Sequence, residues 1–376
     1  MTLTFFSNYL NHHQIGIADE LYSQLGHDFH FVATKPILES ELKGGHDYTS
    51  RPYCINASMD ENMYQMALQL ARESDVCIFG ACSQQFAIER ATNGNDGISF
   101  ELGERWLKKG WLNILSSTLR HWWLNYIRFY RHAPFYKLCC SGFTATDDEK
   151  LGAYKNRHYK WGYFTSVPKI NDEKYFESSS TIRILWIARF LALKHPELPL
   201  KMAQKLKHKG YDFVLDFYGS GPEEELTKIK ANEFGLNDVV NFNGSISNDK
   251  VYDVMLKSDI FLFTSDRNEG WGAVANEAMA NACVLVSSDA IGSTPYLIKD
   301  GYNGLVFKSK DSDSLTDKVE WILNNPSEMA KIKRNAYNTM KSLWNPSNAA
   351  RSLLQLINDL QNGKESSIEN GPCSKA

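Results

Sequence analysis

Two acidic side chains with a spacing suited to ligand chemistry lie in the second half of the chain. Glu269 and Glu277 are eight positions apart, and the apolar run Ile260–Phe263 ends shortly before them. Gly270 and Gly272 let the backbone approach a ligand closely, and the free amide groups at the start of a following helix favour an anionic one. One carboxylate can therefore meet hydroxyls at a reacting centre, while the other binds a ribose.

This block resembles the E-x7-E signature of family 4 glycosyltransferases, the glycosyl transferases group 1, which are retaining enzymes of the GT-B fold. The flanking Glu-Gly-Trp-Gly and Glu-Ala-Met-Ala sequences make the match specific. A bare pair of spaced acids is more often part of a solvated helix. The resemblance implies that Glu269 contacts the donor sugar and that Glu277 binds the ribose. It also implies donor contacts from the four residues that follow Glu269, which are Gly270, Trp271, Gly272 and Ala273.

A second block, built on two cations, resembles the same family. Arg189 follows the predicted strand Ile182–Ile187, and Lys194 stands five residues later, before a predicted helix at 196–209. A departing nucleotide diphosphate gains negative charge as the glycosidic bond breaks, and fixed Arg and Lys side chains stabilise that charge. The resemblance implies this catalytic role for both residues, whereas lone cations near a strand end are usually surface groups.

Glycine turns complete the expected donor half. The segment 218–222 resembles the turn after the second strand of the family's nucleotide domain, and we expect donor contacts at Gly219 and Gly244. Tyr296 stands where the family often has a glutamate. The resemblance covers residues 181–345 well and the first half only in its pattern of elements.

Asp311 and Asp313 have the D-x-D spacing with which another large glycosyltransferase fold holds a metal ion. Here the pair precedes a helical pattern, so we predict that it caps a helix N-terminus. No metal and no obligatory cofactor are therefore expected. The substrate that the resemblance implies is a nucleotide-diphosphate sugar, and UDP is the family's commonest donor nucleotide.

Short apolar runs alternate with helical patterns, which predicts βαβ units, parallel sheets and an α/β fold. We expect two doubly wound, Rossmann-like domains that face each other across a cleft, because such sheets bind ligands beyond the carboxyl ends of their strands. The predicted parts are an acceptor domain at 1–165, a linker at 166–180, a donor domain at 181–345, a helix at 346–362 that packs back on the first domain, and a disordered tail at 363–376.

The predicted strands of the first half are 3–7, 29–34, 76–80, 98–101, 136–140 and 159–164. Those of the second half are 182–187, 213–218, 239–242, 260–263 and 284–287.

Candidate acceptor residues lie in the first half. The loop after the first predicted strand contains His12, His13 and Gly16, where the family has a glycine-containing loop beside the donor phosphate and the acceptor. His13 can polarise an acceptor hydroxyl, although paired histidines in a loop are more often plain polar surface. Glu101 and Glu104 end another strand, where many family members place a histidine near the sugar. Either acid can orient the acceptor, and a helix N-terminal position explains an acid there equally well.

Residues 105–137 contain no acidic side chain and combine basic residues with tryptophans. Core packing explains some of the aromatics, but this mixture is typical of a surface in the bilayer interface, where each cation contributes about 1 kcal/mol against anionic lipid. We predict that this segment contacts an anionic membrane and delivers a polyprenyl-linked acceptor. The residues are Arg105, Trp106, Lys108, Lys109, Trp111, Arg120, Trp122, Trp123, Arg128, Arg131 and Lys137.

The composition argues against several other classes of protein. A net charge of −3 disfavours a general nucleic-acid binder. Seven cysteines without C-x-x-C spacing indicate reduced core thiols. No apolar run approaches the roughly 18 residues of a membrane-spanning helix, and the start of the chain lacks signal-peptide features. We expect a cytoplasmic protein at the inner face of the cell membrane.

These features predict a retaining, metal-independent glycosyltransferase that transfers a sugar to a glycan or a lipid-linked saccharide. The first half is similar in pattern to bacterial capsular and surface-polysaccharide enzymes. Two alternatives remain open. One is a nucleotide-sugar epimerase of the same fold, which would release nucleotide diphosphate without an acceptor product. The other is a non-catalytic subunit of a polysaccharide assembly complex, against which the intact acid and cation pairs count.

Overall fold

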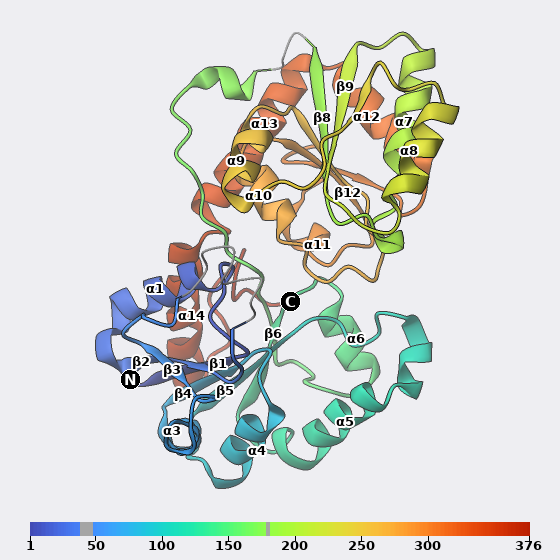
Figure 1. Ribbon diagram of the computed structural model, residues 1–376. Helices are drawn as coiled ribbons and strands as arrows, with labels where there is room; N and C mark the ends of the chain where they lie inside the picture. The colour runs from blue at the N-terminus through green and yellow to red at the C-terminus, as the bar shows by residue number, and fades with distance from the viewer. Residues whose placement is uncertain (38–47, 178–180) are drawn as a thin grey trace. The chain divides into compact units, whose positions relative to one another are not determined.

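The computed structural model describes residues 1–37, 48–177 and 181–376 (Figure 1). Its contacts divide the chain into two compact units. Unit 1 is Met1–Thr165 together with Asn345–Ala376, and unit 2 is Ser166–Trp344. Each unit holds a fully parallel sheet between helices, so the predicted α/β fold with two Rossmann-like domains is confirmed.

The sheet of unit 1 has seven parallel strands in the order β3-β2-β1-β4-β5-β6-β7. Helices cover both faces, and the central strands β1 and β4 are buried along their whole length. The bounds are β1 (Leu3–Ser7), β2 (Phe29–Ala33), β3 (Cys54–Asn56), β4 (Val76–Phe79), β5 (Ile98–Gly103), β6 (Phe135–Cys139) and β7 (His158–Lys160).

The helices of unit 1 form a layer on each face of this sheet (Figure 1). On one face α1 (Ile15–Leu25) packs against α14 (Pro346–Gln361), and on the other α3 (Glu61–Glu73) packs against α4 (Gln84–Asn93). The other helical segments are η1 (Gly26–Asp28), η2 (Gly110–Leu115), α5 (Ser117–Asn125), η3 (Tyr126–Tyr130) and α6 (Thr144–Lys150).

The C-terminal residues 363–376 are ordered against unit 1, so the prediction of a disordered tail is wrong. The Cys373 amide donates to the Lys160 carbonyl at 2.7 Å, and the Lys160 amide donates to the Ser374 carbonyl at 2.8 Å. The side chain of Cys373 is fully buried. The edge strand β7 has backbone groups that need partners, and the tail supplies them. Polar composition alone did not reveal this pairing.

The sheet of unit 2 has six parallel strands in the order β10-β9-β8-β11-β12-β13. This is the strand order of a dinucleotide-binding Rossmann domain, with β8 at the switch point between β9 and β11. The bounds are β8 (Ile182–Ile187), β9 (Phe213–Tyr218), β10 (Val240–Phe242), β11 (Ile260–Phe263), β12 (Val284–Ser288) and β13 (Leu305–Phe307).

Helices also cover both faces of the sheet of unit 2 (Figure 1). One layer consists of α7 (Glu197–His208), α8 (Glu224–Glu233) and α12 (Ser312–Leu323). The other consists of α9 (Asn248–Leu256), α10 (Val274–Ala280) and α13 (Pro326–Ser342). The short segments are η4 (Glu173–Phe176), η5 (Ala192–Lys194) and α11 (Thr294–Leu297).

The described part of the predicted linker, 166–177, packs on unit 2, while residues 178–180 lie outside the described residues. Phe176 and Tyr337 pack in one apolar cluster, and the Tyr337 hydroxyl donates to the Pro168 carbonyl at 3.1 Å. The Lys333 ammonium donates to the Glu177 carbonyl at 2.9 Å. Specific contacts therefore anchor this polar segment.

Most predicted strands agree with the structure, and four of them, β1, β8, β9 and β11, have the predicted bounds. Two strands were missed, β3 and β13. Each has three residues and lies at a sheet edge, so its apolar pattern is too short to recognise.

Gly16 on α1 is a packing residue. A Cβ atom at this position would lie 2.9 Å from the Cγ atom of Pro346, at the start of α14. Because the proline ring cannot rotate away, we expect Gly16→Ala to destabilise unit 1 by about 1–2 kcal/mol despite the better helix propensity of alanine. Urea unfolding measures the effect, with the exposed α1 position Ser23→Ala as the control. Equal stability of the two variants would contradict this packing role.

Candidate active site

The centre of the candidate site in unit 2 is an ion pair between Lys194 and Glu269, Nζ to Oε2. Lys194 ends η5, just after β8, and Glu269 lies in the loop after β11. These strands are neighbours in the sheet, so both loops leave from its carboxyl edge. The side chains are 17% and 15% exposed. The pair is thus sheltered but still reachable from solvent.

A buried hydrogen-bond chain fixes the backbone beneath this pair. The Thr264 hydroxyl donates to the carbonyl oxygen of Lys194 at 2.6 Å, and the Trp186 indole donates to the Thr264 hydroxyl at 3.0 Å. The Asp266 amide donates to the Leu193 carbonyl at 2.9 Å. These bonds join the two loops independently of the charged side chains, so the loops are preorganised.

His195 links the same loops a second time. It adopts a left-handed conformation, with φ at 50°, which places Nδ1 3.0 Å from a Glu197 oxygen and Nε2 3.3 Å from Asp266. The hydrogen bond with Glu197 raises the pKa of His195, and the bond with Asp266 acts in the same direction. Burial alone would raise the pKa of Asp266, but hydrogen bonds from the Asn268 amide, Lys310 and His195 lower it to about 2.

Glu277 lies within α10 and is half-buried. Burial raises the pKa of its carboxyl group to about 7. Across the residues that the structure describes, Glu277 makes no salt bridge. Its carboxyl group therefore takes up a proton near neutrality more readily than an exposed glutamate.

Three predicted donor-contact glycines, Gly219, Gly244 and Gly272, have positive φ angles that other residues rarely adopt. Gly219 has φ at 130°, and a Cβ atom there would lie 1.9 Å from the Ala188 carbonyl oxygen. Its amide donates to the Gly244 carbonyl at 2.7 Å, which joins the loops after β9 and β10. Gly272 has φ at 75°, and a Cβ atom there would lie 2.3 Å from the ring of Phe263. The site therefore depends on glycine for close backbone approach.

The other predicted donor residues lie in the segment between Glu269 and α10. The Gly270 carbonyl accepts from the Gly292 amide at 3.0 Å, and Ala273 directly precedes α10. Trp271, also predicted as a donor contact, has its side chain in the protein interior, so a donor contact there would come from its backbone. Its indole is fully buried, donates to Asn276 at 2.7 Å and packs against an aromatic neighbour, Tyr296. The unusual tyrosine at 296 is part of this core cluster.

Arg189 is exposed at the end of β8. The next residue, Phe190, donates its amide to the Ser220 carbonyl at 2.9 Å, so the Arg189 loop lies against the loop of Gly219. Within the described ranges the guanidinium forms no salt bridge. It is thus a cation available to a ligand at the same sheet edge.

Asp311 caps α12, as predicted. Its carboxylate accepts from the amides of Asp313 and Ser314, each at 3.0 Å. In residues 1–37, 48–177 and 181–376 no group of three or more His, Cys, Asp or Glu side chains is placed to hold a metal ion.

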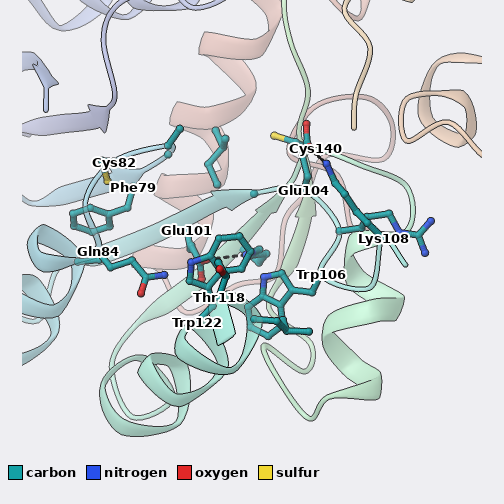
Figure 2. A pocket seen from close by; sticks show the side chains of 18 of the residues that line it. Phe79, Cys82, Gln84, Glu101, Glu104, Trp106, Lys108, Thr118, Trp122 and Cys140 are labelled. Atoms are coloured by element: carbon teal, nitrogen blue, oxygen red, sulfur yellow. Dashed lines mark hydrogen bonds and ion pairs between the residues drawn. The ribbon is translucent and has the colours of Figure 1, made fainter. Parts of the chain in front are cut away.

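In unit 1 the predicted acceptor residues fall into two groups. His12 and His13 have their rings 3.8 Å apart, and His13 stacks on Tyr163 at 5.5 Å. Gly16 faces Pro346 instead, so its side of α1 is occupied by protein. Glu101 and Glu104 both line a cavity of about 580 Å³ (Figure 2).

Glu104 and Glu101 differ in their partners. Glu104 pairs with Lys108 at 2.6 Å. Glu101 pairs with Lys137 at 3.0 Å and also accepts from the Tyr154 hydroxyl. Lys137 is fully buried, so its predicted place on a membrane-facing surface is wrong. Sequence reasoning did not find Tyr154 because it lies far along the chain from β5, the strand that contains Glu101.

The predicted membrane segment is divided between the interior and the surface of unit 1. Trp106 is buried, and Arg105 pairs with Asp147 at 3.0 Å, so these residues belong to the interior. Trp111 and Leu115 are 59% and 76% exposed. We call the exposed set on η2 and α5 the apolar patch, which consists of Trp111, Leu112, Ile114, Leu115, Trp122, Trp123 and Leu124. In the described part of the chain, no helix combines the length and apolar character needed to span a membrane.

Comparison with known proteins agrees with this geometry. Residues 169–339 match the sequence profile of the family described as Glycosyl transferases group 1, which supports a place for the chain in that family. The crystal structure of Anabaena HepE in complex with UDP superposes over 95% of this chain and 100% of that one, with a TM-score of 0.70 and 14% identity. The fold is that of the GT-B glycosyltransferases.

Curated relatives match in part of their length. Alpha-D-kanosaminyltransferase of Streptomyces kanamyceticus is 28% identical over 153 residues, which cover 41% of this chain and 39% of the relative. A putative colanic acid biosynthesis glycosyltransferase, WcaL of Escherichia coli, is 23% identical over 188 residues, 48% of this chain and 46% of the relative. The chain spans half or less of the length of the first curated relatives it matches.

The charged form of His195 is expected to stabilise unit 2. Because its folded pKa is raised, this contribution is fully present below the unfolded pKa near 6.5 and is lost as the pH rises through the folded value. We expect His195→Asn, which tolerates the left-handed backbone, to reduce the loss of stability between about pH 6 and about pH 8.5. Denaturant titrations measure it, with the exposed His208→Asn on α7 as the control. An unaltered pH dependence in His195→Asn would refute the ionic link.

Proposed function

We propose that this protein is a retaining glycosyltransferase, which transfers a sugar from a nucleotide-diphosphate sugar to a glycan or lipid-linked saccharide. The observation that carries the proposal is the sheltered ion pair between Lys194 and Glu269 at the carboxyl edge of a Rossmann sheet. The Anabaena HepE structure, of the same fold, contains UDP, and this supports a UDP-sugar as donor.

Each donor-side residue has a proposed task. Glu277 binds the ribose hydroxyls, since a half-buried carboxyl group that has no ionic partner among the described residues can accept hydrogen bonds from them. Lys194 and the exposed Arg189 hold the diphosphate, where fixed cations stabilise the charge that develops on the leaving group. Glu269 holds Lys194 in place and accepts hydrogen bonds from hydroxyls of the donor sugar.

We propose transfer with retention and without a metal ion. The acceptor oxygen attacks the anomeric carbon from the face that the diphosphate leaves. The bond between that carbon and the phosphate oxygen breaks, a new glycosidic bond forms, and a phosphate oxygen takes the acceptor proton. The cations then stabilise the diphosphate product.

The proposed setting is bacterial surface-polysaccharide synthesis in the cytoplasm, beside the membrane. The name of WcaL, a putative colanic acid enzyme, supports this. The apolar patch supports membrane contact, because large exposed apolar areas are uncommon on soluble monomers. The exposed cations Lys109, Arg120, Arg128 and Arg131 belong to the same segment of unit 1 and favour anionic lipid.

Lys194→Ala and Glu269→Gln are expected to lower kcat/KM for transfer about 100- to 1000-fold, because each removes part of the preorganised charge around the leaving group. A thermal-shift screen of nucleotide sugars first identifies the donor, since a ligand that binds only the folded state raises its stability. Assays then measure both nucleotide release and acceptor product.

Lys201→Ala and Glu225→Gln, at exposed positions of unit 2, serve as matched controls and should keep full activity. Wild-type turnover in Lys194→Ala would remove the proposed mechanism. Nucleotide release without a glycosylated product would favour an epimerase instead.

The double variant Trp111→Ala and Leu115→Ala is expected to bind vesicles of anionic phosphatidylglycerol at least about tenfold more weakly at low salt, because it removes two of the most exposed side chains of the apolar patch. Cosedimentation measures the bound fraction. Trp321→Ala removes an equally apolar exposed side chain from unit 2 and should have no effect. If the wild-type protein does not bind these vesicles, membrane contact through the patch is wrong.

A further inference from the structure

The cavity of unit 1 has the size and wall chemistry of a small-molecule site. Its volume of about 580 Å³ falls within the usual range for such sites. Residues in and after β4, β5 and β6 form it, and η2 and α5 supply further wall residues (Figure 2). The lining combines apolar and aromatic side chains, such as Phe79, Trp106 and Leu119, with a few polar ones.

Five charged side chains line this cavity, and each of the three cations is paired with a carboxylate: Lys137 with Glu101, Lys108 with Glu104 and Arg105 with Asp147. Glu101 is the less exposed of the two lining acids. Its partner Lys137 also lines the cavity but has no exposed surface, whereas the Glu101 side chain is 18% exposed. One carboxylate oxygen pairs with Lys137 at 3.0 Å, and the other accepts from Tyr154. Carboxylate oxygens can each accept more than one hydrogen bond. Glu101 can therefore accept hydrogen bonds from a ligand while its charge stays balanced.

Tyr130 is a second, independent sign of a ligand. It lines the same cavity and is only 2% exposed, yet its hydroxyl has no hydrogen-bond partner among the described residues. Burial, and after it the charge of Glu101, raises the pKa of Tyr130. Buried hydroxyl groups are nearly always paired in native proteins, so an unpaired one that faces a cavity indicates a polar partner there.

Trp122 gives the cavity an apolar wall. It lines the cavity, and its side chain is 38% exposed. In Figure 2 it lies beside Thr118, in the region of Glu101. An indole ring offers a flat apolar face to a ligand. The cavity thus combines a carboxylate, a hydroxyl and an aromatic ring.

We infer that this cavity holds one uncharged, hydroxyl-rich sugar ring of the acceptor. Glu101 accepts hydrogen bonds from hydroxyls of the ring, the Tyr130 hydroxyl pairs with another, and the apolar face of the ring packs on Trp122. A carboxylate or phosphate on the ligand would repel Glu101 and Glu104, while all three lining cations are already paired with carboxylates, so anionic sugars are disfavoured. That the sugar belongs to the acceptor rests on the proposed function, whereas the binding of a sugar ring rests on the side chains that line the cavity.

Saturation-transfer NMR on the full chain tests the inference. The probes are the neutral methyl α-glycosides of glucose, galactose, mannose and N-acetylglucosamine, together with the anionic sugars glucuronate and galacturonate. We expect at least one neutral glycoside to bind, and to bind more tightly than either anionic sugar. Tyr130→Phe should weaken that binding about tenfold, which is the usual effect of one lost hydrogen bond. Tyr136→Phe, the same change on β6 outside the cavity, should have no effect.

Tyr130→Phe is also expected to leave the unfolding midpoint unchanged or higher, because it removes an unpaired buried hydroxyl. A purely structural role for Tyr130 predicts lower stability and unchanged sugar binding. Failure of every neutral glycoside to bind, tighter binding of an anionic sugar, or equal binding by wild type and Tyr130→Phe would each overturn the inference.

Titration with UDP separates this inference from the proposed function. If UDP binds and its affinity falls in Lys194→Ala, but no glycoside binds, only the cavity assignment is wrong. If glycosides bind in a Tyr130-dependent way but no nucleotide or nucleotide sugar binds, the cavity is a sugar site and the proposed transferase function is wrong.

Discussion

The site of unit 2 depends on one geometric constraint, which is that parallel strands all end at the same edge of their sheet. Lys194 follows β8 and Glu269 follows β11, so two residues 75 positions apart form an ion pair. Gly219 and Gly244 follow β9 and β10 at that edge and are joined by a backbone hydrogen bond. Loops that are far apart in sequence thus meet at one edge of the sheet.

Two ion pairs of unit 2 differ in burial, and this difference decides which of them can take part in ligand binding. Asp259 precedes β11 and pairs with Lys333 at 3.1 Å, and both side chains are at most 3% exposed. Glu269 follows the same strand and pairs with Lys194, but this pair keeps access to solvent. A buried pair cannot exchange its partner for a ligand without a large desolvation penalty. The accessible pair can, and this makes the carboxyl edge of the sheet suited to binding.

In the cavity of unit 1, the two members of one ion pair differ in burial. The charge of Lys137 is fully enclosed and neutralises Glu101, which remains available to a ligand. The other two cations that line the cavity, Arg105 and Lys108, are also paired with carboxylates, so the cavity offers hydrogen-bond acceptors to a ligand. The apolar patch on η2 and α5 lies on the outside of segments that also supply walls of this cavity.

The sequence by itself determined the alternation of strands and helices, the α/β class and the two charged pairs that we propose for the chemistry. These signals are local: β8, β9 and β11 are apolar runs with clear ends, and the acidic residues Glu269 and Glu277 frame a glycine turn. These features can be predicted from the sequence because the spacing of apolar residues and the residue types are enough to recognise them.

Tertiary structure alone decided which side chains are buried and what they meet. Trp271 stands within the acidic motif but packs into the core, and the polar tail pairs with the edge strand β7. Tyr130 and Glu101 come from different elements and share one cavity only after folding. Burial and long-range pairing depend on the whole packed unit, so they cannot be predicted from any single stretch of the sequence.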